Sequence, residues 1–121
     1  MKNFILYQIN LTDEQANEVN RAKGDYPQFF RDYLATTCAP NTEKVLAANY
    51  LYDWVADIKA NDLDGVFETG NIGPEENITR YMPMHSVSVG DVIIDEDGDA
   101  YVVASFGFDK IEGFSGMKKA S

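Results

Sequence analysis

The residues that could ligate a metal or catalyse a reaction lie mostly between positions 85 and 99. The densest run of carboxylates in the chain is formed by Asp95, Glu96, Asp97 and Asp99. Acids at alternate positions of a loop can ligate a hard cation such as Ca²⁺. A calcium loop is not completed, because Ala100 stands where glycine is required and Phe106 where the bidentate glutamate belongs. We interpret the run as a solvated acidic turn and expect no metal there.

A second candidate is His85, which is followed by Ser86 and Ser88, a combination that could supply a base and a nucleophile. The glycine-flanked serine turn of hydrolases is missing, and the sequence does not place an orienting acid. We therefore assign no catalytic residue and expect His85 to form hydrogen bonds at the entry of a strand. A small enzyme that uses His85 remains an alternative.

Metal and thiol chemistry receive little support from the composition. The chain contains one cysteine and one histidine, which is too few for a zinc site of the usual kind. Cys38 has no basic neighbour that would activate a thiol, and it has no partner for a disulfide. We expect no cofactor and a reducing, cytoplasmic setting. The apolar run at the N-terminus is too short for a signal peptide or a membrane span.

The charge is distributed unevenly. The net charge is −10, and residues 61–121 carry twelve acids against four bases. Such a surface repels phosphates, so direct binding of nucleic acid is not expected. A protein partner with a basic or DNA-binding surface fits the charge better. The residues that we expect to contact this partner are Asp95, Glu96, Asp97, Asp99, Glu75, Glu76, Arg80, Tyr81, Met84 and His85.

The first half of the chain predicts one strand and three helices. Residues 3–9 are short, aromatic and β-branched, which indicates a strand. Thr12 and Gln15 form a capping box for a helix whose narrow apolar face indicates a position at the surface. Asp25 is expected to cap the next helix, whose aromatic stripe, from Tyr26 to Leu34, is assigned to the core. Asn41 is expected to cap a long helix over residues 42–60, with Trp54 as an anchor in the core.

The second half predicts strands. Residues 66–69 are assigned to a brief strand, and the dipeptide Asp97-Gly98 predicts a tight two-residue hairpin turn. In this register Ile94 pairs with Tyr101 and Glu96 with Asp99. Both faces of the hairpin are apolar near its middle, which places it inside the sheet. The same observation favours a homodimeric structural or assembly module as an alternative, because both faces need cover.

These elements together predict an α+β fold, a small, mainly antiparallel sheet with a long helix packed on one face. The length fits a single domain over residues 1–121. Within it we expect a helix-rich half (1–60), an acidic β half (61–114) and a frayed tail (115–121).

The second half also resembles a known protein family. The segment MHSVSVGDVIIDEDGDAYVVASFGFDKI is similar to the C-terminal module of YodL-like proteins of phages, plasmids and other mobile elements. The residues that match its recurring pattern are His85, Ser86, Ser88, Val89, Asp91, Val92, Ser105, Phe106, Gly107 and Phe108. The likeness covers residues 64–114, including the preceding segment GVFETGNIGPEENITRYMPM. It implies a phage or mobile-element accessory protein in a bacterial cytoplasm and supplies no reaction or catalytic residue.

Overall fold

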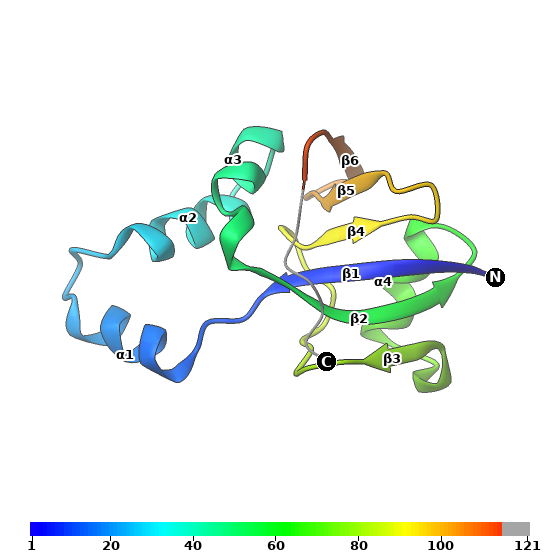
Figure 1. Cartoon of the computed structure of the whole chain (residues 1–121), viewed down its shortest axis with the longest axis horizontal. Coiled ribbons are helices and arrows are strands. Elements are labelled where there is room, and N and C mark those ends of the chain that lie inside the picture. The colour runs from blue at the N-terminus through cyan, green and yellow to red at the C-terminus, as the bar shows by residue number, and fades with distance from the viewer. Residues whose placement is uncertain (115–121) are drawn as a thin grey trace.

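A six-stranded antiparallel sheet with the strand order β3-β2-β1-β4-β5-β6 forms the centre of the computed structural model, which describes residues 1–114 (Figure 1). The strands are β1 (Lys2–Ile9), β2 (Tyr52–Ala60), β3 (Ile78–Arg80), β4 (Val92–Ile94), β5 (Ala100–Val103) and β6 (Phe108–Ile111). The helices are α1 (Asp13–Arg21), α2 (Gln28–Thr37), α3 (Thr42–Ala47) and α4 (Leu63–Asn71), with short 3-10 turns η1 (Asn49–Leu51) and η2 (Glu75–Asn77). The α+β class and the antiparallel sheet are confirmed, and the predicted tail 115–121 lies outside the described residues.

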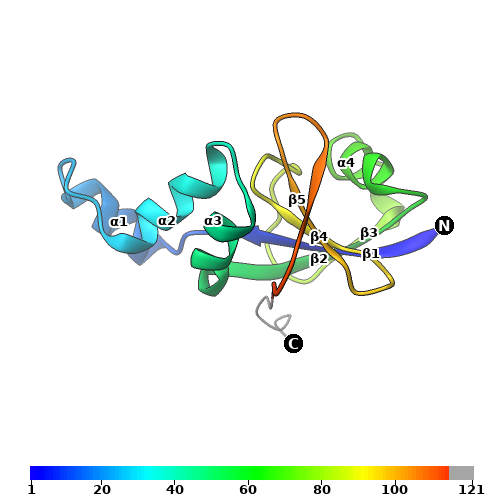
Figure 2. The ribbon, with the colours of Figure 1, turned by 90° about the horizontal axis from the view of Figure 1, so that it is seen from above.

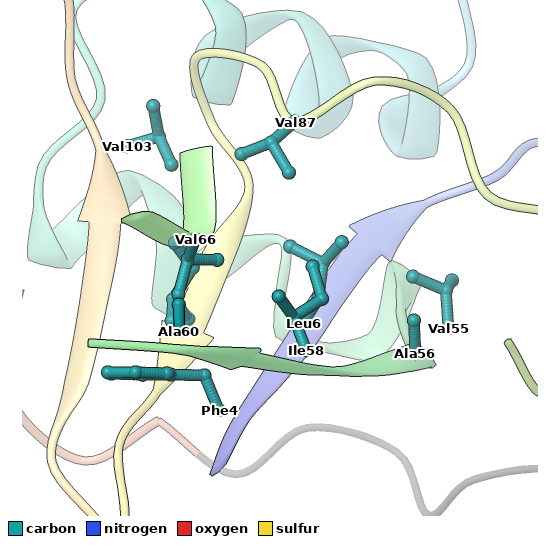
Figure 3. Close-up of a cluster of buried hydrophobic side chains, with 10 residues drawn as sticks. Phe4, Leu6, Val55, Ala56, Ile58, Ala60, Val66, Val87 and Val103 are labelled. Atoms are coloured by element: carbon teal, nitrogen blue, oxygen red, sulfur yellow. The ribbon is translucent and has the colours of Figure 1, made fainter. Parts of the chain in front are cut away.

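Strand β1 is central because it pairs with β2 along its whole length and with β4 on its other side. Successive side chains of a strand point to opposite faces, so β1 contributes to two hydrophobic clusters. The first core contains Phe4, Leu6, Val55, Ala56, Ile58, Ala60, Val66, Val87, Ile93 and Val103 (Figure 3). The second core, on the opposite face, contains Tyr7, Ile9, Val45, Ala48, Leu51, Tyr52, Val92, Ala100, Val102 and Ile111.

The chain itself covers both faces of the β4–β5 hairpin, where Val92, Ile93, Val102 and Val103 are buried. Helix α4 contributes Val66 to the first core, and α3 contributes Val45 to the second, together with Ala48 directly after the helix. Strands β4 and β5 lie inside the sheet, as predicted from the apolar faces of the hairpin. The cover that motivated the homodimer alternative is therefore supplied within one chain.

The predicted helix caps are partly confirmed. Thr12 and Gln15 form the capping box of α1, and the Asn41 side chain accepts a hydrogen bond from the Lys44 N–H at the start of α3. The cap assigned to Asp25 is wrong. Helix α2 begins after Pro27 without a side-chain cap, and Asp25 instead forms an exposed ion pair with Arg31.

The aromatic stripe of α2 is not core, contrary to the prediction. Helices α1 and α2 extend beyond the end of the sheet (Figures 1 and 2), and α1 has no buried residue. Phe29 and Tyr33 pack at the margin of the second core, whereas Tyr26 and Leu34 are exposed. The spacing correctly gave one apolar face, but the sheet reaches only part of it.

The long helix predicted over residues 42–60 is also wrong. Helix α3 ends at Ala47, η1 follows, and residues 52–60 form β2. A bulge interrupts the pairing, since Leu6 lies opposite Ala56 and Tyr7 opposite Trp54, which leaves Val55 as the extra residue. The extra residue shifts the alternation of buried side chains by one position. The resulting spacing imitates the period of a helix.

The brief strand assigned to residues 66–69 lies within α4. Asp62 caps this helix by accepting a hydrogen bond from the Gly65 N–H at 2.7 Å. Its two glycines obscured the helical pattern, and Gly70 has a packing role. A Cβ atom at position 70 would lie 2.3 Å from a methyl carbon of Val87, so glycine lets the segment 81–91 pass closely over α4.

The β4–β5 hairpin is present, but its register differs by one residue from the prediction. Ile93 lies opposite Tyr101 and Ile94 opposite Ala100, with a wider loop between Asp95 and Asp99. Gly98 has a φ of +87° and follows a tight turn, as in three-residue hairpin loops. The carboxylate of Asp95 accepts hydrogen bonds from the N–H groups of Asp97 and Asp99, which favours this wider loop. Relative to the predicted register, this shift of one residue places the side chains of one strand on the opposite face of the sheet.

Tyr52 joins the second core to the segment before β4. Its buried hydroxyl donates a hydrogen bond to the carbonyl oxygen of Gly90 at 2.5 Å, and burial raises the pKa of this phenol. We expect Tyr52→Phe to lower the free energy of unfolding by about 1 to 2 kcal/mol, because the buried carbonyl loses its partner. Urea denaturation measures the change. Tyr50→Phe is the matched control, since Tyr50 is exposed and bonds Asp32 at the surface. Equal losses in both variants would contradict the assignment.

Candidate functional site

Three segments distant in sequence place carboxylates at one end of the sheet. We call this set the acidic end; its members are Asp57 of β2, Asp62 of the β2–α4 turn, and Asp95, Glu96, Asp97 and Asp99 of the β4–β5 turn. Two hollows join them. A hollow of about 510 Å³ is lined by Asp57, Asp95 and Glu96, and one of about 320 Å³ by Asp62, Asp95, Glu96 and Asp97. The four turn acids predicted as contact residues therefore lie together, and they are joined by two acids that the sequence did not single out.

The turn is held in place by its own hydrogen bonds. One carboxylate oxygen of Asp95 accepts two backbone N–H groups, at 3.0 and 2.9 Å, and Glu96 accepts the N–H of Asn3 at 3.0 Å. Lys110 approaches Asp99 at 3.5 Å, and this proximity raises the pKa of the lysine. The like charges predicted to face each other at Glu96 and Asp99 are instead carried by Asp95 and Asp99.

The carboxylates of Asp95, Asp97 and Asp99 have oxygens within 4.8 Å of one another. Calcium takes about six to eight oxygen ligands. Three acids, of which Asp97 is exposed and Asp95 and Asp99 are half-buried, offer fewer, and Asp95 already accepts two backbone N–H groups. The geometry of this turn gives no ground for assigning it a metal.

Asp57 is held in the acidic end by two side-chain hydrogen bonds. Its two oxygens accept hydrogen bonds from the indole N–H of Trp54, at 2.9 Å, and from the hydroxyl of Tyr81. The two rings meet edge to face with centroids 6.1 Å apart. The bond to Asp57 raises the pKa of Tyr81. Trp54 and Asp57 are three residues apart and would point to opposite faces of a regular strand, so the bulge at Val55 brings them together.

The remaining predicted contact residues do not form one surface. Arg80 pairs with Glu75 at 2.5 Å on the exposed edge strand β3, so each neutralises the other. Glu76 is exposed in η2. Met84 packs against the first core, and Tyr81 is engaged with Asp57. His85 belongs to a different cluster.

That cluster is a buried polar network centred on Gln8, which is fully buried in β1. The Gln8 amide nitrogen donates hydrogen bonds to the carboxylate of Asp91 and to the carbonyl oxygen of His85, both at 2.9 Å. Its amide oxygen accepts the N–H of His85 at 3.1 Å, and Asp91 also accepts the N–H of Ser88 at 2.9 Å. The network fastens the segment 81–91, which links β3 to β4, onto the middle of the sheet.

The electrostatics of this network centre on Asp91. Burial raises the pKa of Asp91 to about 6, and the hydrogen bonds from Ser88 and Gln8 and the nearby His85 only partly oppose that shift. Ordinary aspartates lose their proton near pH 4. Asp91 therefore changes charge in a mildly acidic range.

The imidazole of His85 is not arranged with an acid and a nucleophile. Its Nδ1 lies 2.8 Å from the Ser86 carbonyl oxygen and 3.2 Å from the amide nitrogen of Gln8. The hydroxyl of Ser88 donates to the same carbonyl oxygen at 2.8 Å. Asp91 accepts its hydrogen bonds from the amide of Gln8 and from the N–H of Ser88. His85 forms hydrogen bonds, as predicted, but it lies within the segment 81–91 and not at the entry of a strand, since β4 begins at Val92.

Sequence reasoning gave no site role to Gln8, Asp57, Asp62 or Asp91, and no bonding role to Trp54. Gln8 carried a signal, because it is the one polar side chain among residues 4–9 and shares the face of Phe4 and Leu6. Asp57 and Trp54 carried none while residues 42–60 were assigned to a helix.

Comparison of the chain with protein-family models, with curated proteins and with solved structures finds no match in any of the three. Among the described residues, none of the helices is both long enough and apolar enough to cross a membrane. The function must therefore be argued from the residues and their geometry.

Proposed function

We propose that this protein is a non-catalytic accessory protein of a phage or mobile element that binds a host or phage protein through its acidic end. The partner carries a basic surface, as nucleic-acid-handling proteins do, and the carboxylates take the place of phosphates. The protein then acts as an inhibitor or DNA mimic of that partner.

The observation that supports this proposal best is the convergence of the acidic end. Carboxylates of β2, of the β2–α4 turn and of the β4–β5 turn surround two adjoining hollows, against which stand the lysines Lys2 and Lys59. Concentrating one sign of charge at a hollow strengthens its field and steers an oppositely charged partner. The turn is also fixed by its own hydrogen bonds, so little conformational freedom is lost when a partner binds.

A capture experiment tests the proposal. The immobilised protein is exposed to the heparin-binding fraction of a bacterial lysate, which is rich in nucleic-acid-binding proteins, at about 0.15 M salt. We expect the wild-type protein to retain a basic protein that duplex DNA then displaces. The triple variant Asp95→Asn, Glu96→Gln, Asp97→Asn should lose most of this retention, because it removes three charges and keeps the hydrogen-bonding oxygens of the turn.

The matched control removes three charges elsewhere. The variant Asp13→Asn, Glu14→Gln, Glu18→Gln changes exposed acids of α1, at the far end of the molecule from the acidic end (Figures 1 and 2). This control should retain the partner as the wild-type protein does. If both triple variants lose the partner equally, net charge and not the acidic end determines binding. If the wild-type protein retains no partner that DNA displaces, the proposal is refuted.

A further inference from the structure

We propose that the larger hollow of the acidic end, between Asp57 and the β4–β5 turn, is a binding site for an arginine side chain of a protein partner. This inference rests on the proposed function and names the group that the acidic end recognises. We call the hollow the arginine site. It lies on the face of β1, β2 and β3 that carries Asn3, Ile5, Trp54, Asp57, Lys59 and Thr79, with Asp95 and Glu96 as its wall.

The floor of the arginine site is suited to the stem of a long side chain. Ile5 of β1 and Trp54 of β2 line it with apolar surface, and the hollow measures about 510 Å³. An arginine buries its methylene groups along such a surface while its charged head stays at a polar rim. A guanidinium group also packs well against an aromatic ring.

The rim supplies the charge complementarity. Asp57 lies on β2, whereas Asp95 and Glu96 follow β4 on the other side of β1, and Lys59 is the lysine in the lining. This excess of carboxylates repels phosphate or carboxylate ligands and attracts a cation. The planar guanidinium group presents several N–H donors in a fixed fork, so one head can bond carboxylates on two sides, whereas the ammonium of lysine is a point charge.

The carboxylates are already oriented for this task. Asp57 is held by Trp54 and Tyr81, and Glu96 by the N–H of Asn3. A carboxylate has about four positions at which it can accept a hydrogen bond, so these bonds leave capacity for a guanidinium. Acceptors that are fixed before binding lose little freedom on binding, which favours affinity.

Trp54 is the one tryptophan of the chain, so its indole N–H gives a single resonance that reports on this site. The experiment titrates the ¹⁵N-labelled full-length protein with the blocked tripeptide acetyl-Gly-Arg-Gly-amide. Its isosteric neutral analogue, with citrulline in place of arginine, and the lysine peptide are the controls. We expect a saturable shift of the indole resonance with the arginine peptide, a weaker affinity for the lysine peptide and no saturable shift with citrulline.

Two variants locate the site. Asp57→Asn keeps an oxygen for the Trp54 indole and should lower the affinity for the arginine peptide by about fivefold, as loss of one partly exposed charge pair predicts. Asp109→Asn removes an exposed acid of β6 that does not line the hollow, and it should bind the peptide as the wild-type protein does. Equal affinity of Asp57→Asn and Asp109→Asn would overturn the inference, as would equal binding of the arginine and citrulline peptides.

The same spectra separate this inference from the proposed function. If the arginine peptide moves the amide resonances of Asp62 and Asp97, which line the smaller hollow, and leaves the indole unmoved, the arginine site is refuted and the acidic end remains a basic-partner surface. If the capture experiment also retains no basic partner and no resonance moves, both proposals fail. Equal affinity for the lysine and arginine peptides would refute the preference for arginine.

Discussion

Replacing Gln8 by leucine should lower the free energy of unfolding by about 4 kcal/mol, because it removes three hydrogen bonds from buried and half-buried groups at once. Leucine has a similar size but offers no hydrogen bond. The carboxylate of Asp91 and the backbone N–H and carbonyl of His85 would each lose a bond to Gln8. Urea denaturation followed by circular dichroism measures the change.

The control for this prediction is Gln28→Leu. Gln28 is exposed in α2, where its amide bonds Asp32 at the surface. Exposed substitutions of this kind change stability by about 0.5 kcal/mol or less. A loss in Gln8→Leu as small as that of the control would show that the network does not hold segment 81–91 to the sheet.

Asp91→Asn should change how stability depends on pH. Burial raises the pKa of Asp91 from 3.8 to about 6, so the folded state binds the proton more tightly than the unfolded state does. The stabilisation from this proton is complete below pH 4 and is lost as the pH rises to 6. Asparagine stays neutral, and its oxygen can still accept the bonds from Gln8 and Ser88.

We therefore expect Asp91→Asn to match the wild-type protein near pH 4 and to be more stable by up to about 3 kcal/mol at pH 7. Unfolding curves of both proteins at a series of pH values give the difference. Asp109→Asn, which changes an exposed acid, should show no comparable step between pH 4 and 6. A difference between Asp91→Asn and wild type that stays constant across this range would contradict the assigned pKa.

The two clusters should also separate in their effects. The polar network holds segment 81–91 against β1, whereas the carboxylates of the acidic end line hollows that are open to solvent. Asp91 does not line either hollow of the acidic end. A protein that carries Asp91→Asn provides a background in which stability changes and the charge of the acidic end does not.

The sequence by itself determined the features that depend on neighbouring residues. The capping box of Thr12 and Gln15 and the cap at Asn41 are bonds across three positions, so their patterns can be read directly. The first strand and the interior place of the β4–β5 hairpin follow from side-chain type and alternation. The four acids of the β4–β5 turn were likewise visible as one group.

Tertiary structure decided what depends on long-range pairing. Val55 of β2 has no residue opposite it in β1, and this bulge shifts the alternation of buried side chains by one position. The resulting spacing of apolar residues resembles that of a helix. The register of the β4–β5 hairpin depends on one carboxylate bonding two backbone amides, which the dipeptide Asp97-Gly98 does not show. Gln8 and Asp91 are 83 positions apart and meet because β1 and β4 are neighbours in the sheet. Local hydrogen bonds are encoded within a few residues, whereas the faces and hollows that carry the candidate sites arise only when distant strands pair.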